Sequence, residues 1–248
     1  MRNYFTLDGV DSRDFGVYIS GQGTFGAPRK AYTYHSVPGR SGDLIGSEKR
    51  FENLELHYPA FIYSNFRQNI SDLRNFLLSR DGYVRLEDTY NPDEFRLASY
   101  TGEFAPEVTK RNDAGSFDLV FNCMPQRFLR SGEIPITGVA VTQQTIVNPT
   151  QFPSKPLIKF NGTSGSFYVG DYHIYLQIPS SLGLSFVYLD CETMEAYNGT
   201  TNLNQYVSIY KDSSYANDYP VLVPGNTVMR RSGNETFTWE VVPRWWKL

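Results

Sequence analysis

Hydrophobic and polar positions alternate along much of the chain, which is the period-two pattern of half-buried β-strands. The alternation is clear in residues 54–58 and 115–121. Residues 103–109 and 116–123 flank a polar stretch that closes on Gly115, and this arrangement predicts a long hairpin. The first half of the chain is therefore expected to be built mainly from strands.

One segment has helical rather than strand periodicity. Its apolar residues recur at positions i, i+4, i+7 and i+11, namely Phe66, Ile70, Leu73 and Leu77. This spacing predicts a helix over residues 64–80, with Ser64 or Asn65 as the N-cap and Asp81-Gly82 as its end. The helix would pack on the sheet of the first domain.

The second half shows no comparable helical pattern. It contains six short runs rich in β-branched and aromatic residues, separated by Asn-Gly, Gly-Asp and Pro-Gly turns: 157–160, 166–169, 173–178, 184–189, 206–210 and 236–241. Short strands at this spacing predict an antiparallel sandwich or jelly roll. The predicted fold class is mainly β, with an N-terminal β-rich domain that holds one helix and a C-terminal antiparallel β-sandwich.

Charge and proline place a domain junction near the middle of the chain. Residues 1–132 hold 33 charged side chains, whereas residues 133–248 hold 16. Pro149, Pro153 and Pro156 follow the change, and closely spaced prolines are incompatible with the interior of a sheet or helix. The predicted domains are 1–135 and 136–248.

Composition narrows the function classes. The 248 residues carry a formal net charge of -3, so nucleic-acid binding is not expected to be the main function. The sequence contains neither a signal-peptide pattern nor an apolar run of membrane-span length, so we expect no membrane insertion and no secretion by the usual route. The 38 aromatic side chains (17 Phe, 18 Tyr and 3 Trp) are mostly explained as core residues of thin β layers.

Motifs for chemistry are weak. A GxGxxG string at 21–26 is followed by residues that favour loop and strand, whereas dinucleotide binding needs a helix there, so no cofactor is predicted. His35, His57 and His173 lie in no nucleophile or metal-ligand motif, and no metal site is predicted.

The sequence leaves two questions open: whether the two cysteines form a disulfide, and whether any carboxylates are catalytic. Cys123 and Cys191 are expected to be buried free thiols, with a disulfide as the alternative. An enzyme is not predicted. Glycoside hydrolysis stays open only because the spatial separation of carboxylates such as Glu87-Asp88 and Asp93-Glu94 cannot be read from sequence.

Two N-terminal strings resemble the distal tail protein (Dit) family of siphophages, the long-tailed non-contractile phages. Residues 4–18 are similar to the first hairpin of that family, and Val37-Pro38-Gly39-Arg40-Ser41-Gly42-Asp43-Leu44 is similar to its Pro-Gly-Arg-x-Gly-x-Leu loop. The predicted helix, the hairpin at 103–123 and the proline-rich junction follow in the family's order, so the resemblance spans nearly the whole chain.

The resemblance implies a non-enzymatic hub of a phage tail tip or baseplate, located in the virion at the distal end of the tail and made in the host cytoplasm. Members form a ring, usually hexameric, whose annulus consists of N-terminal domains and whose galectin-like C-terminal sandwiches project outward. The implied partners are the major tail tube protein, a tail-associated or baseplate hub protein and receptor-binding proteins. DNA would pass through the ring without sequence-specific contacts.

Two residue sets are candidates for contacts. A closed ring needs two different complementary surfaces on each subunit, and for this interface we select four of the charged residues of segment 38–50, namely Arg40, Asp43, Glu48 and Arg50. The alternative function is a carbohydrate-binding adhesion module, for which the candidates are Tyr215, Tyr219, Trp245 and Trp246. Core packing of a final strand is the simpler explanation of the tryptophan pair.

The sugar-binding signature of galectins is absent. Trp239-Glu240 lacks the following Arg, and His173-Ile174-Tyr175-Leu176 lacks the Asn and Arg of that signature. Galectin-type sugar recognition is therefore not expected.

Overall fold

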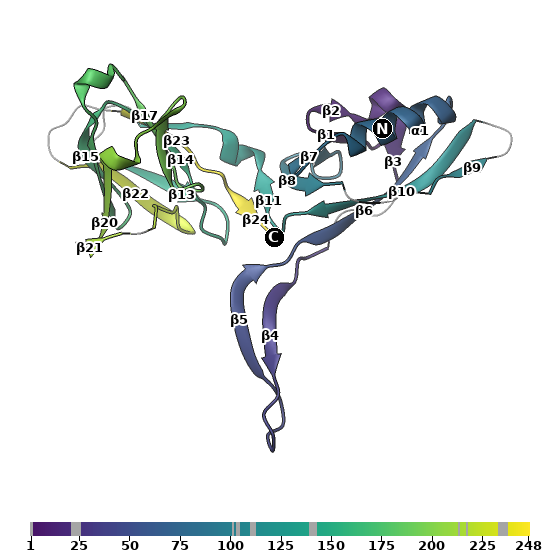
Figure 1. Cartoon of the computed structure of the whole chain (residues 1–248), viewed down its shortest axis with the longest axis horizontal. Coiled ribbons are helices and arrows are strands. Elements are labelled where there is room, and N and C mark those ends of the chain that lie inside the picture. The colour runs from purple at the N-terminus through teal and green to yellow at the C-terminus, as the bar shows by residue number, and fades with distance from the viewer. Residues whose placement is uncertain are drawn as a thin grey trace. The chain divides into compact units, whose positions relative to one another are not determined.

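The computed structural model describes residues 2–20, 26–100, 102, 105–109, 113–138, 143–212, 214–216, 218–232 and 238–248. The chain divides into two units, Met1–Arg127 with Leu248 and Phe128–Lys247, each with its own hydrophobic core (Figure 1). The second unit begins ahead of the predicted boundary at 135/136. The Leu129 N–H donates to the Trp245 carbonyl, and the Arg244 N–H donates to the Gly132 carbonyl (both 2.8 Å), so this segment is bonded to the C-terminal end of the second unit.

The first unit is an antiparallel sheet with the strand order β2-β1-β7-β8-β10-β6-β3, and β9 pairs with β10. Its longest pairing joins β10 to β6, from Gly115 opposite Ile62 to Cys123 opposite Leu54. The predicted hairpin is confirmed where β9 meets β10; residues 103, 104 and 110–112 lie outside the described residues. The strands are β1 (Phe5–Leu7), β2 (Val10–Asp11), β3 (Val17–Ile19), β6 (Leu54–Ile62), β7 (Val84–Asp88), β8 (Glu94–Ser99), β9 (Glu107–Thr109) and β10 (Ala114–Cys123).

The predicted helix is confirmed as α1 (Phe66–Leu78), and its four periodic residues are all buried. One of the two predicted N-cap residues, Asn65, is confirmed in that position, but the predicted end of the helix at Asp81-Gly82 is wrong. Asn65 has a left-handed backbone and no side-chain cap bond; instead the Phe66 N–H donates to the Asp113 carbonyl at 3.1 Å. The helix ends at Leu78, with Ser79 as its C-cap, because the Ser79 N–H closes the last turn by donating to the Asn75 carbonyl at 3.1 Å.

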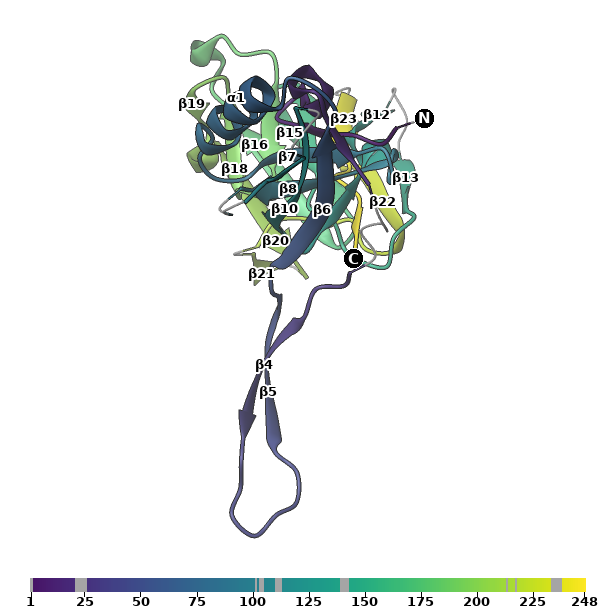
Figure 2. The same ribbon diagram turned by 90° about the vertical axis from the view of Figure 1, so that its right-hand side faces the viewer.

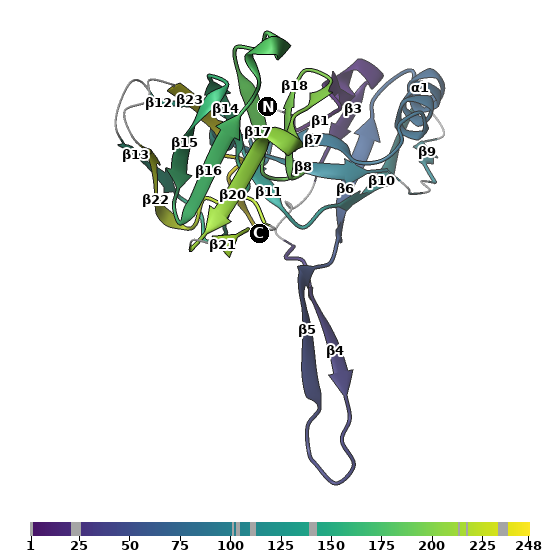
Figure 3. The same cartoon turned by 60° about the vertical axis from the view of Figure 1, so that its left-hand side comes forward.

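Strands β4 (Lys30–His35) and β5 (Leu44–Phe51) form a separate two-stranded sheet (Figures 2 and 3). We call residues 30–51 the hairpin arm. Gly39 and Gly42 in its turn have positive φ angles (76° and 87°), which glycine adopts without strain.

The second unit contains two six-stranded antiparallel sheets, so the predicted fold class is confirmed. All six predicted runs contain strands. One sheet has the order β12 (Ile136–Gly138), β23 (Thr238–Val242), β14 (Leu157–Asn161), β17 (Val187–Asp190), β18 (Glu195–Asn198) and β19 (Thr201–Asn202). The other has the order β13 (Gln143–Asn148), β22 (Gly225–Arg231), β15 (Ser164–Val169), β16 (Tyr172–Gln177), β20 (Val207–Lys211) and β21 (Ser214–Tyr215).

The remaining elements are short. They are β11 (Arg127–Leu129), β24 (Trp246–Lys247) and four 3-10 turns, η1 (Ser12–Phe15), η2 (Arg130–Glu133), η3 (Ser180–Leu182) and η4 (Asn204–Tyr206).

The two sheets of the second unit share one core. Phe160 of β14 and Phe167 of β15 are in ring contact, with centroids 3.8 Å apart. The Trp239 indole N–H of β23 donates to Gln144 Oε1 of β13 at 2.9 Å, which joins the sheets by a hydrogen bond. The inward-facing side chains thus fill the sandwich and leave the other face of each sheet available for contacts.

A bidentate ion pair anchors the C-terminal segment to β17. The Arg244 guanidinium donates to both carboxylate oxygens of buried Asp190, at 2.7 and 2.8 Å. Burial alone would raise the pKa of Asp190. The Arg244 hydrogen bonds, backbone donation from Glu192 and Thr193, and the Arg244 charge together hold that pKa below its usual range.

We expect Asp190→Asn to lower the free energy of unfolding of the second unit by about 1–3 kcal/mol at pH 7, because Arg244 loses its charged acceptor. The depressed pKa of Asp190 means that its stabilisation is present above pH 4 and is lost as the pH falls through the folded-state pKa, so the difference from wild type should shrink in acid. Urea unfolding followed by tryptophan fluorescence measures this, because all three tryptophans lie in the second unit. Glu192→Gln, at the exposed Lys155 pair, is the control and should change little.

Candidate functional surfaces

The hairpin arm is an exposed structure with little support from its own unit. Ala31 is the one buried residue of the arm. Among the described residues, its two strands pair only with one another. Isolated two-stranded hairpins are marginally stable in water, so contact with another surface would stabilise the arm.

One face of the arm is apolar. Tyr34 pairs with Ile45 across the two strands, and these side chains are 60% and 63% exposed. Tyr32 lies on the same face two residues before Tyr34, and the two rings meet edge to face with centroids 6.4 Å apart. We call Tyr32, Tyr34 and Ile45 the arm patch; contiguous exposed apolar side chains of this kind mark interaction surfaces.

The four predicted interface residues all lie on the arm. Arg40 and Asp43 are exposed in its turn, and Glu48 and Arg50 lie in β5, where they form an exposed ion pair at 2.8 Å. Strand β5 is bulged at this point, because its three residues from Glu48 to Arg50 lie opposite the single residue Ala31 of β4. The ion pair is part of this bulge. Such exposed pairs contribute little stability, which leaves these charges available for orienting a partner.

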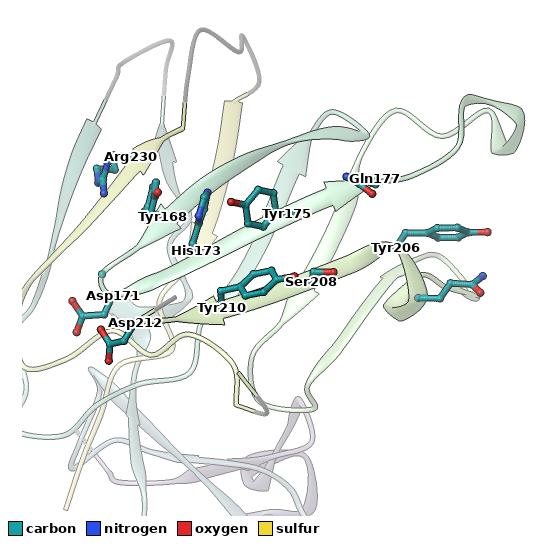
Figure 4. Close-up of a pocket in the computed structure, with 12 residues that line it drawn as sticks. Tyr168, Asp171, His173, Tyr175, Gln177, Tyr206, Ser208, Tyr210, Asp212 and Arg230 are labelled. Carbon is teal, nitrogen blue, oxygen red and sulfur yellow. The ribbon is translucent and has the colours of Figure 1, made fainter. Parts of the chain in front are cut away.

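A second surface lies on the outer face of the sheet that contains β15, β16 and β20. Five side chains form a row across five neighbouring strands, because each residue is paired with the next across adjacent strands. From β22 to β21 they are Arg230, Tyr168, His173, Tyr210 and Tyr215. We call this set the aromatic row. Tyr175 stands two residues beyond His173 on the same face (Figure 4).

Four residues of the aromatic row, all except Tyr215, line an open groove of about 840 Å³ (Figure 4). Arg230 covers the Tyr168 ring at 3.7 Å from its centroid, and Tyr168 stacks on His173 at 3.9 Å with 13° between the ring planes. His173 and Tyr175 follow at 4.1 Å, and Tyr175 meets Tyr210 edge to face at 5.5 Å. The groove therefore has a continuous aromatic floor.

Polar groups border this floor. Asp171 and Asp212 lie on turns at one end, with Gln177 and Ser208 further along. Burial first, and the Arg230 charge second, lower the pKa of His173, so the ring is neutral at pH 7. Within the described part of the chain, its buried Nε2 has no hydrogen-bond partner.

The other predicted contact residues are placed differently. Tyr215 is exposed at the end of the aromatic row, next to Tyr210. Tyr219 packs against the sandwich core, and Trp245 is 4% exposed inside it. Trp246 stacks on Phe152 at 4.4 Å and donates to the Pro153 carbonyl at 2.9 Å. The tryptophan pair therefore packs within its own unit, in agreement with the simpler explanation.

Sequence reasoning missed Tyr168, His173, Tyr175, Tyr210 and Arg230 as a group. Within one strand the sequence does indicate a shared face, since Ile174 and Leu176 alternate with His173 and Tyr175. The sequence does not indicate which residues of different strands are paired, because the residues of the row are far apart in the chain.

Three of the four carboxylates that the sequence singled out are engaged in structural contacts, namely Glu87, Asp88 and Glu94. No cluster of three or more potential metal ligands occurs among the described residues. Asp88 accepts from Tyr58 and from the N–H groups of Tyr90 and Asn91, Glu87 pairs with Arg85, and Glu94 pairs with Arg127 at 2.7 Å. The GxGxxG string falls largely outside the described residues.

The two cysteines are free and buried, as predicted. Burial raises the pKa of Cys123 to about 12 and raises that of Cys191 as well, so both thiols are protonated and unreactive at neutral pH. In the described ranges no helix is both long and apolar enough to span a membrane.

The described residues form a β-rich unit with one helix, followed by an antiparallel β-sandwich, and this fold is similar to that of a solved phage protein. A solved structure with this fold is the Dit protein (gp 19.1) of phage SPP1, described as a paradigm of the hub adsorption apparatus in phages that infect Gram-positive bacteria. It matches 100% of both chains with a TM-score of 0.70 and 16% sequence identity. The predicted resemblance is thereby confirmed at the level of the fold. No family model matches the chain, and no curated protein has a significant match to it.

Proposed function

We propose that this chain is the structural hub of a phage tail tip or baseplate and that it assembles into a closed ring of about six copies. The observation that carries the proposal is the hairpin arm, with its apolar arm patch exposed to solvent. The full-length fold match to a phage hub protein supports it. The chain acts in this role as a structural protein rather than as an enzyme.

The arm supplies one half of a head-to-tail interface. In a closed ring each subunit contacts its neighbour through two different surfaces, and an arm that leaves its own unit suits one of them. Burial of Tyr34 and Ile45 against the next copy would contribute about 1.5–3 kcal/mol for each side chain. Arg40, Asp43, Glu48 and Arg50 would set the orientation at the rim of this contact.

The ring would join the major tail tube protein to a tail-associated or baseplate hub protein, at the distal end of the tail in the virion. Receptor-binding proteins would attach at its periphery. DNA would pass through the centre without specific contacts, because the chain has a net charge of -3 and no excess of Lys and Arg for binding phosphates.

Sedimentation velocity of the purified chain tests the assembly. The expected result at micromolar concentration is one discrete species with the mass of about six copies. A single sedimenting species of 28.3 kDa at high concentration would argue against the hub.

A further inference from the structure

We propose that the groove on the sheet that contains β15, β16 and β20 binds a neutral oligosaccharide, and that its floor is formed by Tyr168, His173, Tyr175 and Tyr210. This site is separate from the ring interface and does not depend on ring formation. It uses residues other than the Trp245-Trp246 pair that the sequence had suggested for sugar contact.

The shape of the site fits an extended ligand. The groove of about 840 Å³ falls in the volume range of ligand sites. The part of the aromatic row that lines the groove crosses four strands, β22, β15, β16 and β20, and at about 4.8 Å between strands it spans roughly 14 Å. This length accommodates a chain of several sugar rings rather than a single compact molecule.

The floor has the chemistry that pyranose rings require. One face of a hexopyranose presents C–H groups that pack on flat aromatic surfaces, while its hydroxyls need hydrogen-bonding groups at the sides. Tyr175 and Tyr210 provide such surfaces, each with a hydroxyl tip. Asp171, Asp212 and Gln177 border the same groove and can accept hydrogen bonds from sugar hydroxyls.

The charges of the lining favour a neutral ligand over a polyanion. Arg230 is the cation among the residues that line the groove, and it already covers the Tyr168 ring. Asp171 and Asp212, which also line the groove, would repel phosphate, sulfate or carboxylate groups. Teichoic-acid-like and nucleic-acid ligands are therefore disfavoured.

Binding is favoured over hydrolysis at this site. A glycosidase acid is kept protonated near neutral pH by an apolar, partly buried environment. Asp171 and Asp212 are exposed on hairpin turns, so the groove offers two solvated acceptors instead.

The test is binding of the full-length protein to an array that carries neutral hexose oligosaccharides together with sialylated, sulfated and phosphorylated glycans. We expect selective binding to neutral members. Titration of the best soluble trisaccharide should then show at least tenfold weaker binding for Tyr175→Ala and for Tyr210→Ala. Tyr188→Ala is the matched control, because Tyr188 is a half-buried aromatic residue, stacked on Tyr197, in the other sheet of the sandwich.

Three outcomes would overturn the proposal: a blank array, binding confined to anionic glycans, or binding that both groove variants retain. Unchanged tryptophan fluorescence and unchanged urea midpoints in the two variants would show that a loss of binding comes from the groove and not from unfolding. The sedimentation result is separate, so failure of this site and failure of the ring can be told apart.

Discussion

Replacing both Tyr34 and Ile45 by serine should convert the assembled protein into single chains. Each change removes an exposed apolar side chain that the proposed ring buries, at about 1.5–3 kcal/mol per side chain. The sum, about 3–6 kcal/mol, weakens each contact by roughly 10²–10⁴-fold. Sedimentation velocity at micromolar concentration should therefore show the mass of one chain, 28.3 kDa, in place of the ring.

The fold itself should tolerate this double substitution. Tyr34 and Ile45 are exposed, so the free energy of unfolding should change by no more than about 0.5 kcal/mol per site. Ile134→Ser is the matched control, because Ile134 is 65% exposed and lies outside the arm. A double variant that still sediments as the full assembly would show that the arm patch does not form the interface.

Trp239→Ala should strongly destabilise the second unit. Trp239 is 1% exposed, and it packs so closely on Gly138 that a Cβ there would lie 2.2 Å from the indole nitrogen. Removing the indole leaves a cavity and also leaves Gln144 without its hydrogen-bond donor. Large-to-small changes of this kind cost about 3–5 kcal/mol.

Urea unfolding followed by the fluorescence of the two remaining tryptophans measures this loss. Trp246→Ala provides the comparison, because Trp246 is partly exposed and should cost less. A loss below about 1 kcal/mol in Trp239→Ala would contradict the shared core between the two sheets.

Local patterns in the sequence predicted those elements whose buried residues all lie within one short segment of the chain. The helix follows from Phe66, Ile70, Leu73 and Leu77, because all four side chains face the same side of one element. The hydrogen bond at its N-terminus did not follow, because the Phe66 N–H donates to the carbonyl of Asp113, which is far along the chain. Cap rules describe side chains next to the helix end and contain no information on such tertiary contacts.

The two candidate surfaces show the same limit. Tyr34 and Ile45 look like ordinary strand residues in the sequence, since only the tertiary structure shows that no core covers them. In the groove, alternation places His173 and Tyr175 on one face, but the register that puts Tyr210 opposite His173 depends on pairing between strands. Trp245 and Trp246 stood out by composition, yet the sandwich buries one ring and Phe152 stacks on the other.

Electron microscopy of the purified protein tests the central claim most directly. The result expected is a closed ring of about six subunits with a central hole, in which the hairpin arm of each subunit, residues 30–51, contacts the next copy. Single particles of one chain, or open chains of irregular length, at concentrations where the protein is stable would contradict the assignment as a tail hub.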